Sequence, residues 1–177
     1  MMKHNVFLSY PKPFLSNQEQ FIEKIRKHLK ERDFEPCTLG VTDYNMDAPL
    51  KAIKEIMENC NGVVTVAFRR NKIKEGVGKP DSDLNQKPSP LNNSWLTSPY
   101  CQIEPAMGYQ LGLPIIIFRE KGVLAEGILE KGVLGIFMPE FDLSGDIDEY
   151  FSSPEWKQLI EHWERQVKEF IDSKSKH

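Results

Sequence analysis

The sequence predicts an α/β protein built on a doubly wound parallel sheet of five strands, with helices on both faces. Short apolar segments of strand length alternate five times with helical segments. Parallel strands need crossover connections, and right-handed crossovers place helices on both faces of the sheet. Two of the predicted strands, 62–68 and 114–118, are apolar almost throughout, as expected for strands buried on both faces. The 177 residues suit one domain, 1–177.

The first half of the chain supplies the first strands and helices in order. A strand at 5–10 (NVFLSY) is followed by a helix at 17–32, where apolar residues recur at helical spacing. The segment 34–39 (FEPCTL) predicts a second strand, and Pro36 places it at an edge of the sheet because proline cannot donate to a ladder. Pro49 begins a second helix, which leads into the buried strand at 62–68.

The second half opens with an irregular segment. Residues 69–97 are rich in Gly, Pro, Asn and Lys, show no periodicity and exceed an ordinary connection, so we expect them to be functional or partly disordered. They lie at the carboxyl edge of the sheet, and we expect them to shape a pocket there. A helix at 104–111 and a fifth strand at 133–138 follow. Ser153 caps a last helix at 154–172, whose aromatic stripe predicts core packing.

Composition excludes several classes of protein. The chain is 40% hydrophobic and 28% charged with a net charge of −3, which is typical of a soluble globular domain and argues against broad nucleic-acid binding. No apolar run approaches the roughly 20 residues of a membrane span. The amino terminus lacks an apolar signal region, which predicts a cytoplasmic location.

Cysteine and histidine usage predicts neither a metal site nor disulfides. The three cysteines are widely spaced without a CxxC pair, and the four histidines form no HxxxH pair. We therefore expect buried, reduced thiols at Cys37, Cys60 and Cys101.

In a doubly wound sheet, ligands bind beyond the carboxyl ends of the strands. Ser9 and Tyr10 end the first strand, and Arg69 and Arg70 directly follow the strand at 62–68, where they could meet a phosphate. Neither GxxxxGK[ST] nor GxGxxG occurs, so a Gly-rich phosphate loop is not predicted.

Several motifs together resemble Toll/interleukin-1 receptor (TIR) domains over about residues 5–140. The first is F-L-S-Y at 7–10, and the second is S-P-Y-C-Q-I-E at 98–104, which has the spacing of the family's S-x-W-C-x-x-E with Tyr100 in place of Trp. The segments 49–68 and 110–118 are similar to the family's second helix, third strand and entry into the fourth strand. No clear third TIR box follows near the carboxyl terminus. The resemblance implies a three-layer, flavodoxin-like fold.

Catalytic TIR domains cleave the bond between nicotinamide and ribose in NAD, so the resemblance implies an N-glycosidic bond as the target. Nicotinamide leaves as a neutral group and the ribose gains oxocarbenium character, which one carboxylate can stabilise or trap covalently. NAD is then a substrate and no cofactor is expected. The implied catalytic group is Glu104. Around it we expect Ser9 and Tyr10 on the ribose or phosphate side, Tyr100 and Trp95 for stacking, Asp43 and Tyr44 in a gating loop, and Arg69 near phosphate.

Pro105 modifies this expectation. Proline inside a helix removes a hydrogen bond and clashes with the preceding turn. We therefore predict that the helix begins near Glu104 or is kinked there. The helix dipole would then hold the carboxylate in its ionised form.

Two alternatives remain open. The segments 10–36 and 104–118 also resemble the nucleoside 2-deoxyribosyltransferase-like family, which shares the fold and a glutamate nucleophile. That family has an aspartate six residues before the glutamate, whereas this chain has Ser98. The other alternative is a non-catalytic TIR-like interaction module.

The resemblance also implies partners. A bacterial antiphage defence TIR of the Thoeris sort, without a second domain of its own, would make an ADP-ribose-derived signal for a separate effector protein. Self-assembly into a homo-oligomer through TIR-type contacts is also expected.

Overall fold

The computed structural model describes residues 3–39, 48–133 and 140–175, and its centre is a five-stranded parallel sheet. The strand order is β2-β1-β3-β8-β9, which confirms the predicted doubly wound α/β fold and is the flavodoxin-like order. From β1 the chain adds β2 on one side of the sheet, and it then adds β3, β8 and β9 on the other side. The connections after β1 and β3 therefore lead to opposite faces, which leaves a crevice at the carboxyl ends of these two strands. The strands are β1 (His4–Ser9), β2 (Phe34–Cys37), β3 (Val63–Ala67), β8 (Ile115–Glu120) and β9 (Glu140–Phe141).

Burial follows the strand order. All five residues of β3 are buried, as predicted for the central strand. Pro36 lies in the edge strand β2, which pairs with β1 alone among the described strands. An edge strand leaves one row of backbone groups unpaired, so a proline there removes no ladder bond.

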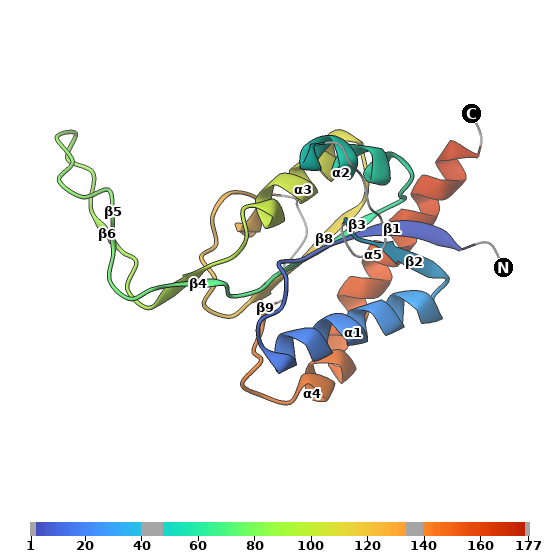
Figure 1. Ribbon diagram of the computed structural model, residues 1–177, viewed down its shortest axis with the longest axis horizontal. Helices are drawn as coiled ribbons and strands as arrows, with labels where there is room; N and C mark the ends of the chain where they lie inside the picture. The colour runs from blue at the N-terminus through green and yellow to red at the C-terminus, as the bar shows by residue number, and fades with distance from the viewer. Residues whose placement is uncertain (1–2, 40–47, 134–139, 176–177) are drawn as a thin grey trace.

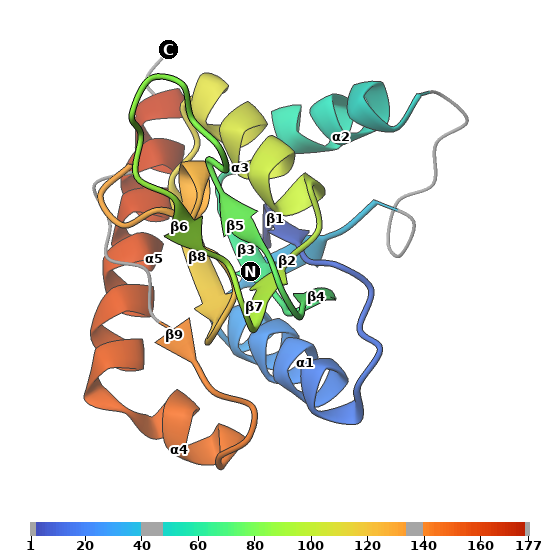
Figure 2. The same cartoon turned by 90° about the vertical axis from the view of Figure 1, so that its left-hand side faces the viewer.

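Helices cover both faces of the sheet (Figures 1 and 2). One core joins alternate strand residues to α1 (Ser16–Glu31), α4 (Ile147–Ser152) and α5 (Pro154–Lys174). The second core lies under α2 (Pro49–Glu58) and α3 (Tyr100–Gln110). Trp156 and Trp163 of α5 are buried in the first core, which confirms that the aromatic stripe packs inside.

Two helix starts match the predictions. Pro49 opens α2, and the Ser153 hydroxyl accepts a hydrogen bond from the backbone N–H of Trp156 at the start of α5.

The helices are amphipathic. The helix α5 has 21 residues, and buried and exposed positions alternate along it. Among the described residues, no helix combines the length and hydrophobicity needed to cross a bilayer.

The predicted fifth strand at 133–138 lies almost wholly outside the described residues. Val133 lies in a turn and is 55% exposed, while 134–138 lie outside the described residues. The strand that completes the sheet is β9, which pairs with the end of β8. Phe141 of β9 is buried and stacks on Phe21 with ring centroids 4.1 Å apart.

Residues 69–97, expected to be functional or partly disordered, form a regular β-ribbon that projects away from the sheet, called here the arm (Figure 1). Trp95 anchors its base, because its N–H donates to Gly122 O (3.0 Å) and its carbonyl accepts from Leu124 N (2.9 Å). A short 3-10 helix, Gly127–Leu129, follows this anchor. The arm contains two antiparallel pairs, β4 (Asn71–Ile73) with β7 (Ser94–Leu96) and β5 (Val77–Gly78) with β6 (Ser89–Pro90).

Candidate active site

Helix α3 carries Glu104, and it begins one turn earlier than predicted. It starts at Tyr100, so Glu104 lies inside the helix and Pro105 follows it without ending the helix. The upstream residues explain the early start. The Ser98 hydroxyl accepts from Tyr100 N (3.3 Å), and the carbonyls of Ser98 and Pro99 accept the next three N–H groups. These bonds satisfy the first turn before the proline is reached.

The Glu104 side chain is buried and is held by the end of β1. It is 9% exposed, and the Ser9 hydroxyl, which is 2% exposed, donates a hydrogen bond to Glu104 Oε2. Burial raises the pKa of Glu104 from 4.5 to about 7, and the bond from Ser9 opposes that rise. The prediction that a helix N-terminus keeps this group ionised is therefore wrong. The carboxyl lies too far inside the helix, and loss of water dominates its pKa.

Glu104 faces a cavity of about 590 Å³ at the crevice between β1 and β3. This volume lies within the range of small-molecule sites, roughly 300–1,000 Å³. The loop after β1, the third residue after β3 and the start of α3 form its wall. The lining residues are Tyr10, Pro11, Lys12, Pro13, Phe14, Arg70, Ser98, Tyr100 and Glu104.

Two cations, Lys12 and Arg70, stand at this cavity. Both side chains are exposed, and neither forms an ion pair with a carboxylate of the described residues. The backbone of Arg70 is fixed, because its N–H donates to Leu96 O at 2.9 Å at the base of the arm. Unpaired cations beside a buried carboxyl suit a ligand that carries phosphate near the bond to be broken.

Three predicted site residues meet at Glu104. Ser9 holds its carboxyl, while Tyr10 and Tyr100 line the cavity. The Tyr10 hydroxyl accepts a hydrogen bond from Arg26 Nη2 (2.7 Å), which ties this side chain to α1. Tyr100 is 41% exposed and stands at the entrance. Its place in the first turn of α3 suits stacking against a base.

Two other predicted residues do not line this cavity. The Arg69 guanidinium lies 3.7 Å from Glu120 Oε1 and donates to Lys121 O at 2.6 Å. It also lies over the Trp95 ring, 5.7 Å from the centroid. Trp95 packs against the α3-side core at the base of the arm. Both residues therefore tie the arm to the body of the protein.

The predicted gating-loop residues Asp43 and Tyr44 lie outside the described residues.

The cysteine nearest to Glu104 along the chain is not a second candidate nucleophile. Cys101, the second residue of α3, is fully buried, and burial raises the pKa of its thiol to about 12, so it is not a nucleophile near neutral pH. Within 3–39, 48–133 and 140–175, no group of three His, Cys, Asp or Glu side chains is placed to hold a metal ion.

Part of the cavity wall was not predicted from the sequence. Arg69 and Arg70 were both candidates for phosphate, and the structure brings Arg70 to the cavity. Lys12 and Phe14 were not singled out, although they follow β1 directly and therefore lie at the carboxyl edge. The arm was expected to shape the pocket. Of residues 69–97, only Arg70 contributes to it.

Similarity to known proteins is found among solved structures. No protein family and no curated protein matches the sequence. One similar solved structure is that of the Clostridium botulinum CMP N-glycosidase BcmB, with a TM-score of 0.48 and 16% identity, covering 82% of this chain and 93% of that chain. At that score and identity, substrate and chemistry have to be argued from the site itself.

Proposed function

We propose that this protein is an N-glycosidase that cleaves the bond between nicotinamide and ribose in NAD, with Glu104 beside the anomeric carbon. The observation that carries the proposal is the placement of Glu104. Its carboxyl is buried and accepts a hydrogen bond from Ser9. It faces a cavity at the crevice between β1 and β3, which is where ligands bind in this architecture.

The reaction requires little of the protein beyond this carboxylate. The bond between C1′ and the pyridinium nitrogen breaks, and its electron pair stays on the nitrogen, so nicotinamide leaves as a neutral molecule. The Glu104 carboxylate stabilises the positive charge that develops on C1′ and its ring oxygen. A water oxygen then bonds to C1′ and releases a proton to solvent, giving ADP-ribose.

The charge of the leaving group favours NAD over a neutral nucleotide. A neutral base needs a proton to leave, and glycosidases with poor leaving groups use a second carboxyl as the acid. Among the described residues that line the cavity, Glu104 is the one carboxyl group. The cationic nicotinamide riboside also favours the ionised form of Glu104 when it binds, which offsets the effect of burial on the pKa.

A nucleotide N-glycosidase acting on nucleoside monophosphates is the second candidate. The observation in its favour is the pair of cations, Lys12 and Arg70, because a phosphate would satisfy them whether it belonged to NAD or to a monophosphate. The same pair argues against a 2-deoxyribosyltransferase acting on unphosphorylated deoxynucleosides. Such a substrate would leave both cations without a partner.

The TIR resemblance extends the proposal to biology. On that reading the protein consumes cytoplasmic NAD in antiphage defence, forms TIR-type homo-oligomers and releases an ADP-ribose-derived signal for a separate effector. A mass spectrum of the product made by activated protein tests this extension. Linear ADP-ribose alone would count against a cyclised signal.

The proposed function is tested by incubating the purified protein, over a range of protein concentrations, with NAD, a nucleoside 5′-monophosphate and a deoxynucleoside. We expect nicotinamide release from NAD, and Glu104→Gln should lower kcat by at least about 100-fold. The matched control is Glu164→Gln. Glu164 is also a buried carboxylate, 3% exposed, but it pairs with His28 and Arg32 away from the cavity, so its variant should retain kcat.

Each other outcome would indicate a different function for this protein. Base release from the monophosphate alone selects the second candidate, and release from the deoxynucleoside alone selects the transferase-like alternative. No turnover of any substrate at any protein concentration selects the interaction module. Equal activity of wild type and Glu104→Gln would refute the role of Glu104 whichever substrate reacts.

A further inference from the structure

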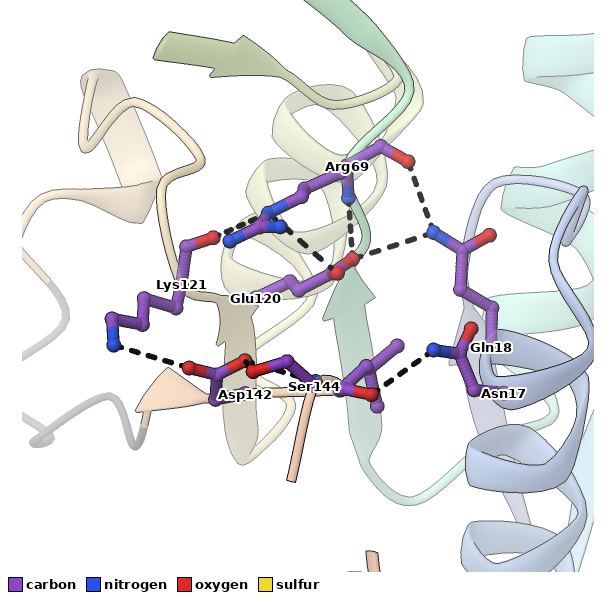
Figure 3. A network of polar contacts seen from close by, with 8 residues as sticks. Asn17, Gln18, Arg69, Glu120, Lys121, Asp142 and Ser144 are labelled. Carbon is purple, nitrogen blue, oxygen red and sulfur yellow. Dashed lines mark hydrogen bonds and ion pairs between the residues drawn. The ribbon is translucent and has the colours of Figure 1, made fainter. Parts of the chain in front are cut away.

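Gln18 connects three segments through one buried amide. It is the third residue of α1 and is fully buried. Its oxygen accepts from Phe14 N at 3.2 Å. Its nitrogen donates to Arg69 O at 3.1 Å and to Glu120 Oε2 at 3.3 Å (Figure 3). The amide therefore ties the loop after β1 to the segment after β3 and to the end of β8.

Glu120 completes the connection from the other side. Its side chain is 3% exposed, and Oε2 accepts the backbone N–H of Arg69 at 2.8 Å (Figure 3). With Gln18 on the carbonyl and Glu120 on the N–H, both backbone groups of Arg69 are held by buried side chains. The next residue, Arg70, therefore leaves from a fixed backbone position and points its side chain at the cavity.

The loop on the opposite wall depends on the same amide. Pro11 and Pro13 have no N–H, so only Lys12 and Phe14 in this loop can donate from the backbone. The N–H of Phe14 goes to Gln18. Both Phe14 and Arg70 line the cavity, whereas Gln18 and Glu120 do not. Gln18 and Glu120 therefore hold the backbone near two residues of the cavity wall without lining the cavity themselves.

We propose that Gln18 and Glu120 are positioning residues that fix the Pro11–Phe14 loop and Arg70 on the two walls of the cavity, and so set the affinity for the phosphate-bearing part of the substrate. This inference rests on the proposed function for its substrate. The bond-breaking step belongs to Glu104, to which neither residue forms a hydrogen bond.

The kinetic test replaces Gln18 with methionine, a side chain of similar length that lacks the amide donor and acceptor. Gln18→Met should raise KM at least about tenfold and leave kcat within about threefold, the pattern of lost uniform binding. Glu120→Gln keeps an acceptor for Arg69 N and should give a smaller rise. Glu164→Gln is the control for loss of a buried polar partner, because it should lower the melting temperature without changing KM. A Gln18→Met enzyme with unchanged KM overturns the inference.

A second measurement does not need activity, so it separates this inference from the proposed function. Backbone hydrogen exchange should be at least about tenfold faster in Gln18→Met than in wild type at Phe14 and Arg69. The Phe14 N–H loses its acceptor, and the Arg69 carbonyl loses the bond that helps to hold the backbone while its N–H still faces Glu120. Exchange along α5 should stay the same. If no substrate is turned over, the proposed function fails, and this measurement still decides the inference. Unchanged exchange at Phe14 and Arg69 rejects it, and faster exchange confined to them supports it.

Discussion

Replacing Glu104 with Gln should change the pH dependence of folding. Burial raises the pKa of Glu104 from 4.5 to about 7, so the folded state holds a proton that the unfolded state has released between those values. The contribution of this group to stability is complete below pH 4.5 and is lost as pH rises through about 7. At about 1.36 kcal/mol per pH unit, the interval from 4.5 to about 7 corresponds to about 3 kcal/mol. Glutamine does not titrate and keeps the volume and one acceptor for Ser9.

Urea unfolding of both proteins at pH 5 and at pH 8 measures this effect. The free energy of unfolding of Glu104→Gln minus that of wild type should be about 2 to 3 kcal/mol larger at pH 8 than at pH 5, with equal m-values. Other groups with raised pKa, such as Glu120, are present in both proteins and cancel in the difference. A difference between the proteins that is the same at both pH values would refute a buried, proton-holding Glu104, and a change of opposite sign would mean that the carboxylate is stabilised by the fold.

Other expected outcomes follow from the same site and core. The kcat/KM of the wild type should rise with pH through about 7, because the free enzyme needs Glu104 ionised; a pH–rate profile checks this, and a flat profile from pH 6 to 8 contradicts it. Ser9→Ala removes a bond that lowers the pKa of Glu104, so the midpoint of that profile should move upward. Arg70→Ala should raise KM about tenfold or more, since a charge-assisted bond to phosphate is worth about 1.5–3 kcal/mol, and added salt should weaken the wild type more than the variant. Gly108→Ala should lower the free energy of unfolding by about 1–2 kcal/mol, because the new Cβ would lie 2.7 Å from Val63 Cγ2; unchanged stability in urea would mean that β3 and α3 can move apart.

The sheet was largely predictable because buried parallel strands leave a simple signal. The run GVVTVAF identified β3, and Pro36 correctly placed β2 at an edge. Elements without such a signal were missed. The short helix α4 has no buried residue, so it shows no hydrophobic period.

The candidate site was predictable where a motif fixed a position along the chain. The end of the predicted first strand placed Ser9 at the carboxyl edge of the sheet, and the resemblance of residues 98–104 to the TIR motif placed Glu104 there. Spacing could not show that burial would raise the pKa of Glu104. It also could not distinguish Arg69 from Arg70, because adjacent residues after a strand leave in different directions and only the buried carboxylate of Glu120 decides between them.

The closure of the arm at its base has a consequence for how the chain can be cut and rejoined. Because Asn71–Ile73 pairs with Ser94–Leu96, the two ends of the excursion meet where it leaves the body. The crossover from β3 to α3 is therefore topologically as short as if 74–93 were a tight turn, and its length adds little loop-closure entropy. A new amino and carboxyl terminus opened at the outer end, or a foreign domain inserted there, would leave the order of assembly of the sheet untouched.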